Sequence, residues 1–222
     1  MYVAALDYFE VFKVYPNASA TALVTAKMDW KLFSPNLMES YDVHSDHSRT
    51  RVIDGRLASG DRYQFFVANL LWVKGKETSA PIGHYPVHNY NFDLASLNFS
   101  FRHLIDPTQS FEIGVQMPWF DLVHLGEIEY LGKASIQYLG EEACHSTRCR
   151  KYLITGEALG HKQGYLWVNK DNGYFEKVEI PFRDNPSWKD FKLELTSIES
   201  MSNEEWNKYI QEQTDAFFGK KP

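Results

Sequence analysis

Residue types that can move protons gather in the middle of the chain. They are Tyr90, Asp93, His103, Asp106, Asp121, His124 and Glu127. An apolar pocket would shift the pKa of such groups by desolvation, which gives a fold without a cofactor an acid or base near neutrality. Our first catalytic candidate is His124, because its neighbours in the sequence are apolar, and Asp121 and Tyr90 are its candidate partners. The alternative is a core histidine bonded to a backbone carbonyl, with the other groups in solvated loops.

Pairs of metal-ligating residues also occur. His84 and His88 share one face of an extended strand but lie about 13 Å apart along it, too far for a common metal ion. Cys144 and Cys149 flank a four-residue turn and are expected to lie opposite each other across a hairpin, at a distance that a disulfide accepts. Two reduced thiols are nevertheless the expected state in a cytoplasmic protein. The sequence therefore predicts no metal site and no cofactor.

Motifs and charge exclude several classes of function. The sequence contains no G-x-S-x-G, P-loop, G-x-G-x-x-G or H-E-x-x-H motif, which argues against the corresponding hydrolases, nucleotide-dependent enzymes and zinc proteases. The 23 basic and 29 acidic side chains give a net charge of −6, and the longest basic cluster is Arg148, Arg150 and Lys151. Nucleic acid is not an expected partner.

The high aromatic content, 15% of the residues, is typical of β-rich proteins. Aromatic side chains can line a pocket for a small apolar molecule, or they can fill a closed core. Our candidates for ligand binding are Trp72, Phe99, Phe101, Trp119, Phe120, Tyr138 and Trp167.

Strands must position these residues, because apolar and polar side chains alternate over much of the chain. Alternation predicts a strand at 191–196, and Asn172-Gly173 predicts a hairpin turn between strands at 165–170 and 174–180. Further strands are expected at 8–14, 111–117, 133–139 and 150–155. In the first half, Asp54-Gly55 and residues 59–61 predict turns between strands at 48–53 and 62–73. About ten or eleven strands are expected in all.

Helices are predicted at two places. Ser202 and Glu205 have the spacing of a capping box, and apolar residues then recur at helical spacing, so residues 203–218 should form an amphipathic helix. Residues 93–104 fit a helical face and also alternate, and we expect a short helix there. Residues 19–32 are equally ambiguous and are expected to form a strand.

Length and composition indicate one folded domain over residues 1–222. The hydrophobic share of 44% and the charged share of 23% are those of a soluble globular protein. The longest apolar run, 65–73, is far too short for a transmembrane segment. No secretory signal is visible, so we expect a cytoplasmic location, or a periplasmic one only if a signal has been removed.

The second half carries a family resemblance. Residues 126–205, with Gly164-Tyr165-Leu166-Trp167-Val168, the turn at 169–173 and Phe191-Lys192-Leu193-Glu194-Leu195, resemble an uncharacterised bacterial domain family related to the lipoprotein-carrier (LolA/LolB-like) half-barrels. In the first half only the strand order is similar. The resemblance implies a mainly β fold, in which a curved antiparallel sheet forms an incomplete barrel around a helix. It also implies a concave apolar face, which holds acyl chains in the better-known relatives, and no catalytic residues.

Two functions follow from these observations. In the first, an aromatic-lined half-barrel cavity binds a hydrophobic small molecule or acyl chain and releases it unchanged. In the second, the same cavity is a cofactor-independent acid/base enzyme, an isomerase, cyclase or hydro-lyase acting on a lipophilic metabolite. A structural or protein-binding role comes third, and the sequence does not predict the oligomeric state.

Overall fold

Alternating side chains build two antiparallel meanders, one from each half of the chain. The computed structural model describes residues 1–15, 20–70, 73–92, 94–119, 126–144, 147–181 and 190–219. Within these residues, the first seven strands form one sheet in chain order, and the last seven form a second sheet, also in chain order. The pairing is antiparallel except between β8 and β9, which are parallel.

The first sheet comprises β1 (Tyr2–Ala5), β2 (Tyr8–Lys13), β3 (Thr21–Asp29), β4 (Ser34–Val43), β5 (Arg49–Ala58), β6 (Arg62–Val67) and β7 (Lys76–Pro81). The second comprises β8 (Val87–Asn89), β9 (Phe111–Pro118), β10 (Ile128–Cys144), β11 (Thr147–Thr155), β12 (Gln163–Asn169), β13 (Phe175–Pro181) and β14 (Asp190–Glu194). The helices are α1 (Ala95–Ser100) and α2 (Asn203–Phe217), with 3-10 turns η1 (Tyr90–Phe92), η2 (Phe101–His103) and η3 (Glu157–Leu159).

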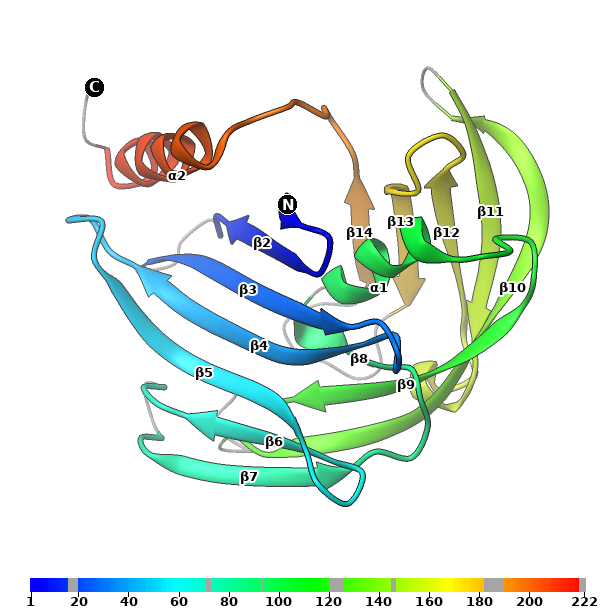
Figure 1. Cartoon of the computed structure of the whole chain (residues 1–222), viewed down its shortest axis with the longest axis horizontal. Helices are drawn as coiled ribbons and strands as arrows, with labels where there is room; N and C mark the ends of the chain where they lie inside the picture. Colours follow the sequence, from blue (N-terminus) through cyan, green and yellow to red (C-terminus); the bar gives the residue numbers. More distant parts are fainter. Residues whose placement is uncertain are drawn as a thin grey trace.

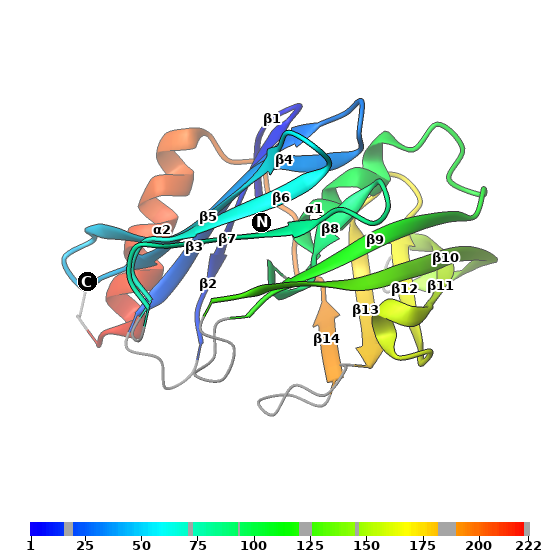
Figure 2. The ribbon, with the colours of Figure 1, turned by 90° about the horizontal axis from the view of Figure 1, so that it is seen from below.

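Together the sheets curve into an incomplete barrel. Figure 1 shows the strands sweeping from β2 through β7 to β9 and on to β14, with α1 on the concave side. Contacts of β7 with β10 and of β8 with β4 join the two sheets. The view from below shows α1 between the sheets and α2 on the other side of the first sheet (Figure 2). The predicted mainly β half-barrel around a helix is therefore confirmed.

Helix α1 is buried on both sides, which explains its ambiguous sequence pattern. Leu97 and, in the following turn, Phe101 pack into the core cluster of the second sheet. Ala95 and Phe99 pack into the cluster of the first sheet. A segment that fills the space between two sheets needs apolar residues on all sides and shows no clean amphipathic period. The expected short helix is confirmed.

Most predicted strands are confirmed, including β3 in the ambiguous region, but the turn predicted at Asp54-Gly55 is wrong. These residues lie inside β5, which runs on to Ala58. A Cβ at Gly55 would overlap the ring of Phe65 on the neighbouring strand. Glycine is therefore present here because an aromatic ring packs onto the backbone. The strand predicted at 62–73 is also shorter than expected, since β6 ends at Val67.

The C-terminal helix packs on the face of the first sheet opposite to α1. Trp206 and Ile210 form a small core with Leu23 and Val43, whereas the neighbouring Val24 faces the α1 side. The indole nitrogen of Trp206 also donates to Glu10 at 2.7 Å. The side chain and backbone of Ser202 and Glu205 form the predicted capping box. No helix in the described ranges has the length and apolar character that crossing a bilayer requires.

Replacing Ser202 by alanine is expected to lower the stability of α2 by about 1 kcal/mol, because the amide of Glu205 then loses its acceptor. Hydrogen exchange of the α2 amides measures this loss directly. Ser202→Thr keeps a hydroxyl cap and is the matched control. Equal exchange rates in the two variants would contradict the capping role.

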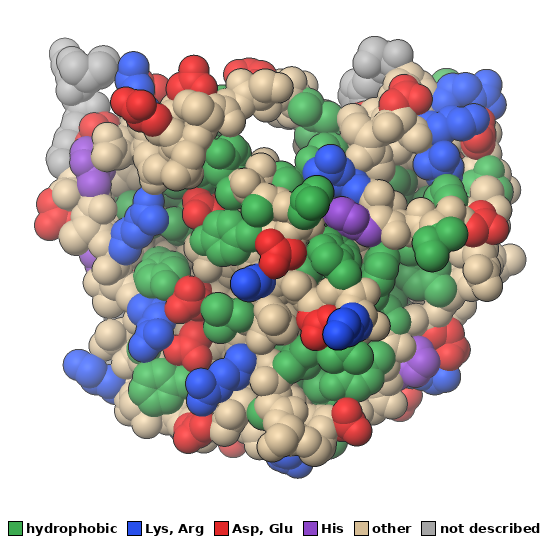
Figure 3. All heavy atoms as spheres, in the orientation of Figure 1, with side chains coloured by type: hydrophobic (Ala, Val, Ile, Leu, Met, Phe, Trp, Pro, Cys, Tyr) green, Lys and Arg blue, Asp and Glu red, His purple; other side chains and the backbone are tan. Residues whose placement is uncertain are grey.

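The cysteines form a disulfide, so the expectation of two reduced thiols is wrong for this structure. Cys144 and Cys149 are joined with a Cα–Cα separation of 5.8 Å. They are not directly opposed, because Cys144 pairs with Thr147 and Cys149 with Glu142 in the β10–β11 ladder. The bond is therefore a diagonal link near the end of the hairpin. Figure 3 shows basic side chains gathered at this end, where Arg148 forms an ion pair with Glu141 at 3.2 Å.

Candidate functional site

An apolar pocket lies beside α1 at one end of the half-barrel, and we take it as the candidate site. Its volume is about 320 Å³. The apolar part of its wall is formed by Phe33, Pro86, Leu97, Phe101, Leu104, Ile105 and Phe111. Helix α1 lies on the concave side of the half-barrel (Figure 1), and the pocket lies between α1 and the loop 104–110.

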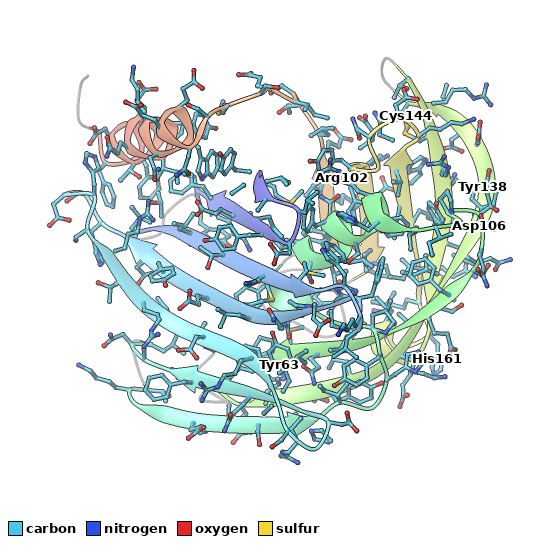
Figure 4. The ribbon with its side chains drawn as sticks, in the orientation of Figure 1. Tyr63, Arg102, Asp106, Tyr138, Cys144 and His161 are labelled. Carbon is cyan, nitrogen blue, oxygen red and sulfur yellow. A yellow bond between two sulfur atoms is a disulfide. The ribbon has the colours of Figure 1, made fainter. Side chains whose placement is uncertain are left out.

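Three elements hold the pocket wall in place. Helix α1 and the turn η2 contribute one side, and β8 contributes His88 from the opposite side. The loop 104–110 closes the third side. Its position is fixed by the Tyr152 hydroxyl, which donates to the carbonyl of Pro107, and by Asp106, which accepts from the amide and hydroxyl of Thr108. Figure 4 shows Asp106 on this loop, close to Tyr138 of β10.

His88 is the most deeply buried polar side chain of the pocket wall, with 1% of its surface exposed. Its Nδ1 lies 2.9 Å from the Oγ of Ser96 on α1, and Ser96 is equally buried. Its Nε2 is also buried, and none of the described residues offers it a hydrogen-bond partner. Burial lowers the pKa of His88 to about 3, so the imidazole is neutral at physiological pH.

His103 forms part of the pocket rim. Its ring packs against Trp30 in a tilted arrangement, with 4.0 Å between the ring centroids, and meets Phe99 edge-on with a centroid distance of 5.3 Å. Partial burial lowers its pKa, and the neighbouring Arg102 guanidinium adds to this effect. Arg102 itself is bonded to the hydroxyl of Tyr174 and lies over that ring.

Among the described residues that line the pocket, the basic side chains are histidines, and none is a lysine or an arginine. The hydroxyl of Ser100 donates to the backbone carbonyl of Ser96. Asp106 is exposed, and its hydrogen bonds from Thr108 hold its pKa below the usual value, so it remains negative. A charged guest would therefore meet one carboxylate at the rim and a neutral imidazole inside.

The predicted catalytic residues do not form the site. Tyr90 is buried in the core cluster of the second sheet and is not among the pocket residues. Asp121 and His124 lie outside the described residues. Of the other titratable candidates, His103 and Asp106 do meet at the pocket.

Of the predicted ligand-binding aromatics, Phe101 forms part of the pocket wall. Phe99 points to the other side of α1, where it packs on Phe9 and Trp30. Tyr138 packs against the ring of Tyr152 in the core of the second sheet. Trp72 and Phe120 lie outside the described residues.

Two tryptophans on the candidate list belong to other surfaces. Trp119 packs partly against the core and donates its indole N–H to Glu129. Trp167 lies between Leu166 and Val168, which both face the core of the second sheet, so its own side chain points to the opposite face. There it lies 4.9 Å from the ammonium groups of Lys151 and Lys177 and donates to Glu142.

Sequence reasoning missed the pairing of His88 with Ser96. It weighed His88 only as a metal ligand beside His84, and the structure separates the two histidines. His84 precedes β8 and lies near Glu112, at 4.0 Å, whereas His88 faces α1. Among the described residues, no group of three His, Cys, Asp or Glu side chains has the geometry of a metal site.

Comparisons with known proteins give no further guide. No family model, curated protein or solved structure matches this chain.

Proposed function

We propose that the protein binds a small lipophilic molecule in the pocket beside α1. The observation that carries the proposal is an apolar cavity of about 320 Å³ whose wall includes a buried polar atom, His88 Nε2, with no hydrogen-bond partner among the described residues. Small-molecule sites commonly combine apolar walls with a few placed polar groups. The half-barrel around a helix is also the architecture that the resemblance to the lipoprotein-carrier family implied.

The pocket limits the size of the guest. An apolar cavity of about 150 Å³ holds one benzene molecule, so a pocket of this volume fits about two fused rings or a chain of about ten carbon atoms. For a guest of that size, apolar contacts support a dissociation constant on the order of 1–100 μM. A long acyl chain would have to leave part of its length outside.

Binding is favoured over acid/base catalysis for a chemical reason. A general base is most effective when its pKa lies near the working pH, and burial moves His88 far below that range. His103 on the rim is the pocket residue that an enzyme would use. Its ring is already packed against Trp30, and Asp106 accepts a hydrogen bond from Thr108.

Filling the pocket should abolish binding. Ser100 is buried in the wall, and Ser100→Phe would place a ring in the cavity, whereas Ser100→Ala leaves the space open. Titration with naphthalene, followed by its fluorescence, is expected to show binding to the native chain and to Ser100→Ala within about threefold. Ser100→Phe should bind at least tenfold more weakly, since about 1.4 kcal/mol of apolar contact is lost.

The two variants also control for folding, because both lose the same hydroxyl bond to Ser96. Urea unfolding should show that Ser100→Phe is folded under the titration conditions. Equal naphthalene affinity in all three proteins, or no binding to any of them, would overturn the proposal.

A further inference from the structure

We propose that His88 forms the polar end of this pocket and that the natural guest carries a single uncharged hydroxyl or carbonyl group that bonds to His88 Nε2. This inference rests on the proposed function, and it narrows the class of guest. It predicts a lipophilic alcohol, phenol, ketone or aldehyde in preference to a free fatty acid or other carboxylate.

The first step is the position of the imidazole. His88 lies in the pocket wall, is 1% exposed, and has its Nδ1 engaged by Ser96 Oγ at 2.9 Å. The remaining ring nitrogen, Nε2, has no partner among the described residues. A buried polar atom without a hydrogen bond costs free energy, about 1–3 kcal/mol in typical cases, so such atoms in native proteins have a partner such as a water or a ligand.

The second step is the direction of the hydrogen bond. A serine hydroxyl can both donate and accept. When Ser96 donates to Nδ1, the proton of the neutral ring resides on Nε2, which then donates to a carbonyl oxygen. When Nδ1 donates to Ser96, Nε2 accepts from a hydroxyl. The Ser96–His88 pair therefore suits a guest with either group.

The third step is charge. A carboxylate placed at His88 would be buried against a neutral ring, with no lysine or arginine among the described pocket residues to pair with it. Asp106 at the rim would repel it further. Ser100 would not stabilise the carboxylate either, because its hydroxyl proton is already donated to the carbonyl of Ser96.

Three probes with the same ring system separate these effects: naphthalene, 2-naphthol and 2-naphthoate. At pH 7 the native chain is expected to bind 2-naphthol about five- to tenfold more tightly than naphthalene, the gain of one net hydrogen bond. It should bind 2-naphthoate at least tenfold more weakly than 2-naphthol. Equal affinities for naphthalene and 2-naphthol, or tighter binding of 2-naphthoate, would overturn the inference while leaving the proposed function standing. Failure of all three probes to bind would overturn both.

The double variant His88→Leu with Ser96→Ala assigns the effect to this pair. Removing both partners together avoids leaving one of them buried and unpaired. We expect the variant to bind naphthalene within about threefold of the native chain and to lose the preference for 2-naphthol. His84→Leu is the matched control, because this histidine lies near Glu112 and is absent from the pocket wall, and it should keep the preference. A preference that survives in the double variant would show that another group holds the hydroxyl.

A measurement on the native chain does not depend on the folding of any variant. The ¹⁵N chemical shift of His88 Nε2 should move on addition of 2-naphthol and stay nearly unchanged with naphthalene. An unchanged Nε2 shift at saturating 2-naphthol would contradict the proposed hydrogen bond.

Discussion

Lowering the pH from 7 to 4.5 is expected to reduce the free energy of unfolding by about 2–3 kcal/mol through His88 alone. Burial holds the pKa of this side chain at about 3 in the folded protein, against 6.5 for an unfolded chain. Below pH 6.5 the unfolded state therefore binds a proton that the folded state does not bind. Stability falls with decreasing pH by up to about 1.4 kcal/mol per unit, and the loss ends near pH 3.

Urea unfolding at several pH values between 7 and 4.5 measures this slope. The double variant His88→Leu with Ser96→Ala lacks the titrating group, so its stability should fall by about 2–3 kcal/mol less than that of the native chain over the same range. Val87→Ala, at an equally buried position of β8, is a destabilising control that keeps His88. Parallel pH profiles for the native chain and the double variant would show that His88 is not held neutral by burial.

The strands and the C-terminal helix were predictable because their determinants are local. Alternation at 191–196 needs only neighbouring residues, and the capping box of Ser202 and Glu205 lies within one helical turn. The turn predicted at Asp54-Gly55 failed because the reason for Gly55 lies on another strand, in the ring of Phe65. A glycine that makes room for a ring and a glycine that makes a turn look alike in the sequence.

The candidate site was harder to predict because it depends on contacts between distant segments. His88 becomes buried only when β8 pairs in parallel with β9 and α1 brings Ser96 to its Nδ1. One error could have been avoided. Leu166 and Val168 face the core, and alternation along β12 already placed Trp167 on the opposite face.

Replacing Phe101 by alanine is expected to cost about 3–5 kcal/mol of stability and to enlarge the pocket at the same time. Phe101 is 4% exposed. The centroid of its ring lies 5.0 Å from that of Tyr152, 5.3 Å from that of Phe175 and 5.8 Å from that of Phe111. It also forms part of the pocket wall. Removing it therefore leaves a cavity that is continuous with the space for the guest.

Phe99→Ala is the matched control, because Phe99 is fully buried on the other side of α1 and is absent from the pocket wall. Urea unfolding should show a similar loss of stability in both variants. Guest size should distinguish them: only Phe101→Ala is expected to shift its preference from naphthalene, with two rings, to phenanthrene, with three. A Phe101→Ala protein that keeps the native preference, or a Phe99→Ala protein that shifts in the same way, would show that the guest does not bind against this wall of α1. Because both variants lose a phenyl group from the same short segment, general loosening of α1 would affect the two equally, and a difference between them reports the position of the guest.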